Sequence, residues 1–293
     1  MDYPLPDLDA ETPILIAGAT ASGKSELAVK IAQVYGGKII NADAFQIYAD
    51  WQFLTARPAV EDMADIPHHL YGHVPWGRPY SVGDWLREIT PLLISGPRPI
   101  IVGGTGLYFH ALTQGLTDIP AIPDDITQAA RAGLAAGQIT EMLDDLDATT
   151  RARIDTLNPR RVQRAWEVQQ ATGRGLAAWQ DETPPPLLPL SQSIALVLDV
   201  PKEDLTQRIE TRFSKMVANG ALDEVAKMAP RWDDSLQVFK AIGAPELYAH
   251  LCEELSLPAA IERASIATRQ YAKRQRSWFR AKHKDWQWIR PTN

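Results

Sequence analysis

The sequence predicts an α/β protein with a parallel, P-loop NTPase-like sheet that is flanked by helices and carries a helical insertion domain. Three observations predict this class. A phosphate-loop pattern joins an apolar run to an amphipathic segment near the N-terminus. Further short apolar runs alternate with segments of helical periodicity. A proline-bounded stretch in the middle of the chain has helical patterns and no convincing strand.

Four short apolar runs are predicted to be the buried strands of the sheet. They lie at residues 14–17, 38–42, 100–102 and 194–198. Helix-patterned segments separate them, as parallel strands joined by crossover helices require. These elements predict a sheet whose carboxyl ends face one edge, where ligands of such folds bind.

Two later helices are expected in the same domain. One begins near residue 203 and ends at residues 219–220, and a long one runs from about residue 258 to residue 280. Together with the four strands, these helices indicate that residues 1–118 and 190–293 form the α/β core, which ends in a basic helix.

The helical insertion domain is expected at residues 119–189. Pro120 and Pro123 open this stretch, and three consecutive prolines at 184–186 close it. Proline interrupts helices and strands, so both ends are predicted to be connecting segments.

One helix of the insertion has clear signals at both ends. Asn158 can cap it, Pro159 suits its first turn, residues 160–172 follow, and Gly173 can end it. We therefore predict a helix over residues 160–172.

A phosphate-binding loop is predicted at residues 18–25, between the first strand and the first helix. The segment matches the Gly-x4-Gly-Lys-Ser pattern in the context that the pattern needs. Loop N–H groups face an anion, Lys24 adds a mobile charge, and the Ser25 hydroxyl can ligate Mg²⁺, the one cofactor that we expect. The residues predicted to hold the diphosphate or triphosphate are Gly18, Ala19, Thr20, Ala21, Ser22, Gly23, Lys24 and Ser25.

Polar residues follow the second and third predicted strands, at the same edge as the phosphate loop. Asp43 is a candidate general base or metal ligand, because an acid beside a diphosphate repels it unless a cation or a substrate proton compensates. Alternatively, Asp43 caps the next helix. Thr105, after Gly103 and Gly104, could orient a nucleophile or a bridging oxygen, or its hydroxyl could bond its own backbone.

Two arginines are placed one turn apart on the helix that begins near residue 203. Arg208 and Arg212 share one helical face. Near the cleft they would neutralise phosphate oxygens, and on the surface they would be solvated; the spacing leaves both alternatives open.

Two basic surfaces are predicted on a chain whose net charge is −6. Between residues 269 and 284 there are seven Lys or Arg residues and no acid, and four of them share a helical face: Arg269, Lys273, Arg276 and Arg280. Interleaved aromatic residues could stack on unpaired RNA bases, although most are expected to fill the core. The insertion has a second cluster, composed of Arg160, Arg161 and Arg164. Together they suggest a polyanion held in a defined place.

Composition argues against several other classes of protein. The single cysteine, Cys252, excludes an internal disulfide framework and a multi-cysteine zinc site. The histidines at 68, 69 and 73 lack a carboxylate at a familiar spacing, so no metal site is expected there. No apolar run approaches about 20 residues, and the acidic N-terminal segment does not fit a secretory signal. We expect a cytoplasmic protein that does not enter membranes.

These features resemble the tRNA dimethylallyltransferase family, also called tRNA isopentenyltransferase. The resemblance covers nearly the whole chain and keeps the order of the motifs. The motifs are GATASGKSELA, NADAFQIYADWQFLTARP, PHHLYGHV with PYSVGDW, IIVGGTGLYFHAL, NPRRVQRAWEV, QRIETRFSKMVANGALDEV, AIGAPEL and TRQYAKRQRSWFR.

The resemblance implies a prenyl transfer from dimethylallyl diphosphate to N6 of the adenosine 3′ of the tRNA anticodon. It implies that Asp43 is the general base, that Thr105 contacts the reacting groups, and that the insertion clasps the anticodon stem-loop. Arg212 would join the phosphate loop in holding the diphosphate, and we expect the chain to act as a monomer. The residues implied to touch tRNA are Asp43, Ala44, Phe45, Gln46, Thr105, Arg160, Arg161, Val162, Gln163, Arg164, Lys240, Ala241, Ile242, Gly243 and Lys273.

Two rival functions share the phosphate loop. A small-molecule kinase could use the insertion arginines as a lid and Asp43 as base, but it gives no reason for the basic, aromatic C-terminal helix. A nucleotide-dependent switch is disfavoured, because the sequence has no Asn-Lys-x-Asp segment for recognising a guanine base.

Overall fold

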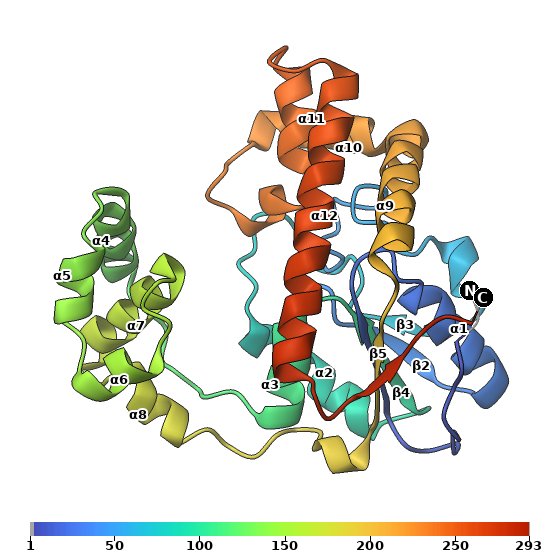
Figure 1. Ribbon diagram of the computed structural model, residues 1–293, viewed down its shortest axis with the longest axis horizontal. Coiled ribbons are helices and arrows are strands. Elements are labelled where there is room, and N and C mark those ends of the chain that lie inside the picture. The colour runs from blue at the N-terminus through green and yellow to red at the C-terminus, as the bar shows by residue number, and fades with distance from the viewer. Residues whose placement is uncertain (1–2, 293) are drawn as a thin grey trace. The chain divides into compact units, whose positions relative to one another are not determined.

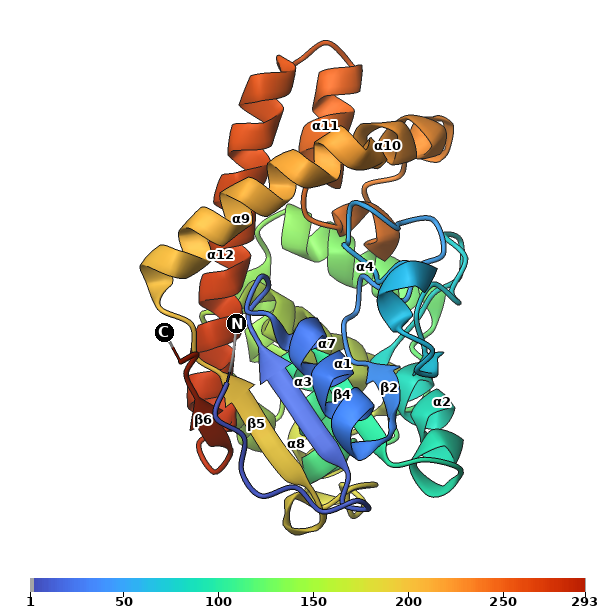
Figure 2. The ribbon, with the colours of Figure 1, turned by 90° about the vertical axis from the view of Figure 1, so that its right-hand side faces the viewer.

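The computed structural model describes residues 3–292, and its centre is a six-stranded parallel sheet (Figures 1 and 2). The strand order is β3-β2-β4-β1-β5-β6, and every neighbouring pair is parallel. The fold class predicted from the sequence is confirmed. The strands are β1 (Ile14–Gly18), β2 (Lys38–Asn41), β3 (His68–His69), β4 (Pro99–Gly103), β5 (Ile194–Leu198) and β6 (Gln287–Ile289).

The two edge strands, β3 and β6, were not predicted. They contain only two and three residues, and neither forms an apolar run. Edge strands have one open side and need no continuous apolar sequence, so sequence periodicity could not reveal them.

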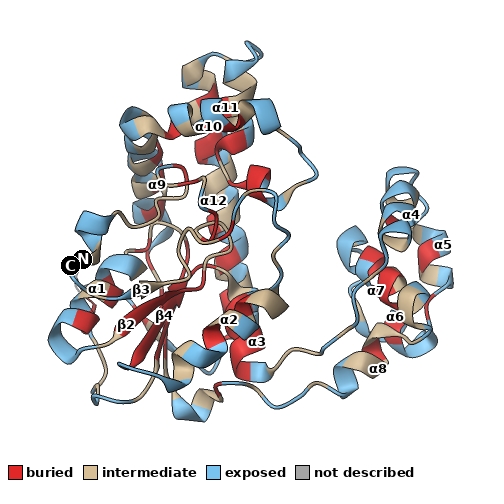
Figure 3. Cartoon of the chain, turned by 180° about the vertical axis from the view of Figure 1, so that it is seen from behind, coloured by how far each residue is buried: buried red, intermediate tan, exposed pale blue. Residues whose placement is uncertain are grey.

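Seven helices of the described chain pack on or beside the sheet in the larger unit. Helix α1 covers one face through Leu27 and Ile31, which meet Ile14 and Ile16 of β1. Helices α2 and α3 and the end of α12 cover the other face (Figure 3), so each central strand is buried on both sides. These helices are α1 (Lys24–Tyr35), α2 (Val82–Ile94), α3 (Gly106–Gln114), α9 (Lys202–Met216), α10 (Leu222–Met228), α11 (Ala244–Leu251) and α12 (Leu257–Lys282).

A second apolar cluster lies beyond the carboxyl edge of the sheet. It joins helices α9 to α12 to the segment after β2 through Trp51, Phe213, Phe239 and Leu247. Helix α12 contributes to this cluster with its first half and to the sheet core with Phe279, so it connects the two (Figure 1).

The helical conformation does not stop at residues 219–220, where the sequence predicts the end of helix α9. The chain passes through one π-helical turn, Val217–Ala221, and continues as α10. Gly220 has a φ of 119°, a conformation that glycine adopts without steric cost, so the helix kinks there instead of stopping.

The smaller unit comprises Gln114–Leu187 and contains helices only. This unit begins before residue 119, the start predicted from the sequence. The segments that lead into and out of it lie side by side, with the hydroxyls of Thr117 and Thr183 2.6 Å apart. Ala130, Met142 and Val162 form its core. The helices are α4 (Asp124–Ala135), α5 (Ile139–Asp144), α6 (Ala148–Arg153), α7 (Pro159–Thr172) and α8 (Leu176–Asp181).

Helix α7 confirms the signals identified in the sequence. The Asn158 side chain accepts hydrogen bonds from the N–H groups of Arg160 and Arg161, and Gly173 ends the helix with a φ of 67°. Across residues 3–292, no helix combines the length and the apolar character needed to cross a membrane.

Candidate active site

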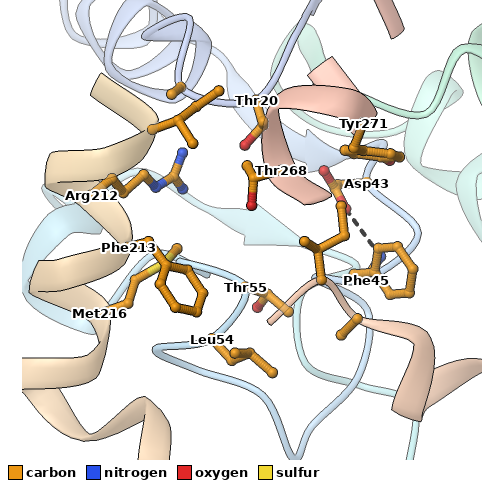
Figure 4. Close-up of a pocket in the computed structure, with 14 residues that line it drawn as sticks. Thr20, Asp43, Phe45, Leu54, Thr55, Arg212, Phe213, Met216, Thr268 and Tyr271 are labelled. Atoms are coloured by element: carbon orange, nitrogen blue, oxygen red, sulfur yellow. Dashed lines mark hydrogen bonds between the residues drawn. The ribbon is translucent and has the colours of Figure 1, made fainter. Parts of the chain in front are cut away.

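The phosphate loop and Asp43 share one region at the carboxyl edge of the sheet. Two adjoining cavities occur there, a smaller one of about 70 Å³ and a larger one of about 840 Å³. Figure 4 shows Arg212 and the Asp43 carboxylate on opposite sides of the smaller cavity. The carboxylate therefore faces the same space as the anion cradle, as the sequence predicted. Both cavities are lined by Thr20, Ala21, Asp43, Thr55, Arg212 and Met216.

The phosphate loop has the backbone geometry of an anion cradle. Ala21 and Gly23 have φ values of 62° and 86°, and this left-handed geometry curls the chain into the start of α1. Alanine rarely adopts such a φ, and strained residues of this kind gather at functional sites. Gly18 is required for packing, because a Cβ there would lie 2.8 Å from the Ser22 hydroxyl.

Two cations face the cavities without a carboxylate bonded to them. Burial lowers the pKa of Lys24 to about 8, although Asp43 acts in the opposite direction. Burial also lowers the pKa of Arg212, again against the effect of Asp43. Among residues 3–292, neither side chain forms a salt bridge, and Lys24 donates only to the Ala19 carbonyl at 3.2 Å. Such a pair of desolvated cations suits a bound dianion.

Arg208 and Arg212 thus have different environments although they share a helical face. Arg212 lines both cavities, whereas Arg208 lines neither of them and lies near Tyr3, where burial raises the phenol pKa against the opposing charge of Arg208. Of the two alternatives that the spacing left open, Arg212 fits the phosphate-facing one.

Asp43 combines a structural contact with an open carboxylate. Its Oδ1 accepts the Phe45 N–H at 3.0 Å, which is the local turn contact expected of a capping acid. Its backbone is fixed by Asn41, whose side chain bonds the Asp43 N–H and carbonyl. The side chain is half-buried and lines both cavities, so the turn contact holds the carboxylate in place without covering it.

Thr105 contacts the segment that carries Asp43 and lines neither of these two cavities. Its hydroxyl oxygen accepts the Ala44 N–H at 2.9 Å, and its own N–H donates to the Ala42 carbonyl at 3.1 Å. The hydroxyl therefore ties the end of β4 to the segment that carries Asp43. The preceding Gly103 permits this approach, since a Cβ there would lie 2.0 Å from the Ala42 carbonyl oxygen.

The apolar wall of the smaller cavity was not identified from the sequence. Leu54, Ile209, Phe213 and Met216 form much of it. Leu54 is fixed by Glu224 of α10, whose carboxylate accepts the N–H groups of residues 52, 53 and 54 at 2.7 to 2.9 Å. These contacts cross about 170 residues of sequence, so no local pattern could have predicted them.

Helix α12 also supplies unpredicted residues to the site. Thr268 and Tyr271 line the smaller cavity, and Gln275 is buried one turn further along. Burial and then the Asp43 charge raise the pKa of Tyr271, whereas hydrogen bonds with Thr105 and Gln275 act in the opposite direction. A signal existed: these polar residues fall on the helix face that buries Ala264 and Ala272, where apolar residues are expected.

The arginines predicted to touch tRNA in the insertion are exposed, but two of their neighbours are not. Val162 is fully buried in the core of the smaller unit, and Gln163 is buried between Arg160 and Glu167, which it bonds at 3.0 and 2.7 Å. The implied tRNA contacts of Val162 and Gln163 are therefore wrong for these side chains. They face inward because positions 162, 163, 165 and 168 form the buried side of α7.

The segment at residues 240–243 also contains both an exposed residue and residues that face inward. Lys240 is exposed, whereas Ala241 and Ile242 line the smaller cavity. Gly243 is buried with a φ of 96°, and a Cβ there would meet the Phe213 ring at 2.5 Å. Of residues 240–243, Lys240 alone has the exposure that a surface contact needs, and the buried Gly243 does not fit the contact implied for it.

The basic face of α12 is largely neutralised by local acids. Arg269 pairs with Glu210, and Arg276 and Arg280 lie 3.8 and 3.9 Å from Asp199. Lys273 is exposed and forms no ion pair with any described residue. Phe279 and Trp286 are buried, as expected for most of the aromatic residues.

The chemistry of the site fits Mg²⁺ held in part by its ligand. Among residues 3–292, no group of three or more His, Cys, Asp or Glu side chains could hold a metal alone. Ser25 and Asp43 do line the larger cavity, and Mg²⁺ favours such oxygen ligands together with substrate phosphates and water. Of the histidines, His68 and His69 form β3, and His73 bonds Glu88 at 2.7 Å.

Comparison with known proteins gives full-length matches. Residues 46–282 match the family model described as IPP transferase, and residues 12–69 match the one described as Isopentenyl transferase. The tRNA dimethylallyltransferase of Dinoroseobacter shibae is 57% identical over 98% of this chain and 99% of its own. That of Roseobacter denitrificans is 58% identical over 94% of this chain and 98% of its own.

Two solved structures share the fold over nearly the whole chain. A eukaryotic dimethylallyltransferase acting on tRNA has a TM-score of 0.82 at 27% identity, covering 97% of this chain and 74% of that one. The tRNA isopentenylpyrophosphate transferase of Bacillus halodurans has a TM-score of 0.68 at 31% identity, covering 96% and 90%.

Proposed function

The chain belongs to the tRNA dimethylallyltransferase family, and we propose that it transfers a dimethylallyl group from dimethylallyl diphosphate to N6 of the adenosine 3′ of a tRNA anticodon. The product is N6-isopentenyladenosine. One observation carries the proposal: the Asp43 carboxylate lines the same cavities as the phosphate loop and Arg212. A leaving diphosphate and a proton-accepting base thus fit in one pocket, which is what this transfer requires.

The donor end of the pocket stabilises the leaving group. The allylic carbon–oxygen bond breaks with carbocation character, and negative charge grows on the departing diphosphate. Lys24, Arg212 and the N–H groups of the phosphate loop meet that charge in a desolvated place, where they act most strongly in the transition state. Ser25 would help to hold Mg²⁺, which would supply further charge neutralisation.

The acceptor end of the pocket positions and deprotonates the amine. The lone pair of N6 is delocalised into the adenine ring, so the amine is a weak nucleophile. The Asp43 carboxylate is held by the Phe45 N–H and faces the cavities, where it accepts the N6 proton as the carbon–nitrogen bond forms. An adenine must leave its stack to reach this group.

The smaller cavity suits the hydrocarbon part of the donor. Its volume of about 70 Å³ corresponds to roughly five to seven water-sized groups, at about 10–15 Å³ each. Leu54, Phe213 and Met216 line it and exclude water, which would otherwise capture a cation-like prenyl group.

Exposed basic residues supply the proposed tRNA contacts. Arg160, Arg161 and Arg164 lie on the helical unit, and Lys240 and Lys273 lie on the core. Each can contact backbone phosphates, whereas Phe45 and Gln46 line the cavities and can contact the extruded nucleotide. We propose that the chain acts as a monomer, since it supplies all of these groups itself.

A mass measurement tests the proposed function. The chain is incubated with dimethylallyl diphosphate, Mg²⁺ and an anticodon stem-loop RNA that has an unpaired adenosine 3′ of the anticodon. The RNA should gain the mass of one five-carbon unit, and an RNA with guanosine at that position should gain none. ATP turnover in a parallel incubation without RNA, together with no added mass in the first assay, would instead indicate the kinase alternative.

A further inference from the structure

Gln275 of α12 connects the two walls of the active site. Its side chain is 5% exposed. Its Oε1 accepts the Thr20 N–H of the phosphate loop at 2.9 Å, and its Nε2 donates to the Gly104 carbonyl at 2.9 Å. One amide therefore bonds two loops that are 84 residues apart in sequence, as Gly104 and Thr20 differ by that number.

A glutamine amide is suited to make both contacts at once. The Thr20 N–H requires an acceptor and the Gly104 carbonyl requires a donor, and glutamine offers one of each on the same planar group. Gly104 leaves room for it, because a Cβ at that position would lie 2.3 Å from Nε2. The side chain is thus fitted to this position and is not incidental packing.

Each of the two loops that Gln275 bonds is followed by residues of the active site; we call this link between the loops the Gln275 bridge. Beyond Thr20 are Ala21 and Lys24, which line the larger cavity. Beyond Gly104 is Thr105, whose hydroxyl oxygen accepts the Ala44 N–H, next to Asp43. The bridge therefore runs from the anion cradle, through Gln275, to the segment that carries the carboxylate.

We propose that Gln275 is a positioning residue that sets the spacing between the diphosphate cradle and the Asp43 carboxylate. This inference rests on the proposed function, because it assigns the spacing to the prenyl transfer. Gln275 lines neither of the two cavities. It acts by holding the allylic carbon and N6 at reacting distance, where an error of about 1 Å costs about a hundredfold in rate.

The test uses Gln275→Met, which keeps the length of the side chain and removes its hydrogen bonds to Thr20 and Gly104, together with the one to Tyr271. The matched control is Gln270→Met on the exposed side of the same helix. Single-turnover transfer to the stem-loop RNA, the dissociation constant of inorganic diphosphate and the melting temperature are measured for each. Wild-type transfer is established first, so a failure of the proposed function is recognised before any variant is compared.

We expect Gln275→Met to slow single-turnover transfer by about tenfold to a hundredfold while diphosphate affinity changes less than about threefold. Gln270→Met should match the wild type in both. Transfer within about twofold of the wild type would overturn the inference, even if the melting temperature falls, because the role would then be structural. A loss of diphosphate affinity equal to the loss of rate would also overturn it.

Gln275→Glu serves if the methionine variant does not fold. It keeps an acceptor for the Thr20 N–H but places an oxygen against the Gly104 carbonyl, so only the Asp43 side of the bridge is lost. Transfer should again be slower by about tenfold or more. Transfer at the wild-type rate would contradict the inference.

Discussion

The cations of the active-site pocket and several of those on the exposed helix faces have opposite surroundings. Lys24 and Arg212 are desolvated, and no salt bridge to either is found among residues 3–292. By contrast, Arg153, Arg161 and Arg269 are partly exposed, and each pairs with a nearby carboxylate. The two sets have the same charge but different partners.

This difference in partners indicates a separate role for the pocket cations and for the surface cations. A desolvated cation without an anion lowers the stability of the fold, so its presence in the pocket indicates an anionic ligand that restores the balance. An exposed ion pair contributes only about 0–1 kcal/mol, and its cation can exchange the carboxylate for an RNA phosphate at little cost. Pocket cations should therefore determine donor binding and rate, and surface cations should determine tRNA affinity in small steps.

The largest effect is expected at the carboxylate that faces both pocket cations. Asp43→Asn should slow transfer by about a hundredfold or more, because the amide cannot accept the N6 proton. Diphosphate affinity should not decrease, since a negative charge is removed from the pocket. Single-turnover rates measure this, with Asp223→Asn, an exposed acid on α10, as control. Near-normal turnover of Asp43→Asn would show that another group is the base.

Removing a pocket cation should come next. Lys24→Ala should lower kcat/KM for the donor by about a hundredfold, because the charge that meets the leaving diphosphate is lost. Steady-state kinetics with varied dimethylallyl diphosphate measure it, and Lys227→Ala on the exposed side of α10 is the control. Equal losses in the two variants would remove the distinction between pocket and surface cations.

The pocket cation also predicts a pH dependence. Burial lowers the pKa of Lys24 to about 8, so this side chain loses its proton as the pH rises from 7 to 9. Donor affinity should fall by about tenfold over that range, because only the charged form pairs with the diphosphate. Lys24→Arg should be nearly independent of pH there, since guanidinium stays protonated. Titration of inorganic diphosphate at both pH values measures it, and a pH-independent wild type would contradict the assignment.

Surface cations should give the smallest effects. Arg160→Ala should weaken tRNA binding only a few-fold and reduce the salt slope of log affinity by about 1, because one phosphate contact is lost. Lys273→Ala should behave in the same way. Filter binding of tRNA over a range of salt concentrations measures both. An unchanged slope would exclude that residue from the RNA interface.

The sequence predicts features that depend on neighbouring residues, but not contacts between segments that are far apart in the chain. The phosphate loop and Asp43 follow their strands directly, so local patterns located them, and a parallel sheet brings them together. The contacts of Gln275 with Thr20 and Gly104 connect distant segments, and no local pattern predicts which partner a buried amide finds. The tRNA contact implied for Val162 is wrong for another reason. The family resemblance implies tRNA contact for every residue from 160 to 164, whereas helical periodicity places Val162 and Ala165 on the buried side.

The central claim is that the pocket cations, and not the surface cations, hold the diphosphate. Calorimetric titration of inorganic diphosphate into the wild type, Arg212→Gln and Arg87→Gln tests it most directly, because Arg87 is exposed and paired with Asp84 at 2.7 Å. We predict that Arg212→Gln binds about tenfold to a hundredfold more weakly, since it loses one charge-assisted contact of about 1.5–3 kcal/mol, and that Arg87→Gln binds like the wild type. Equal affinity in all three proteins would contradict the account.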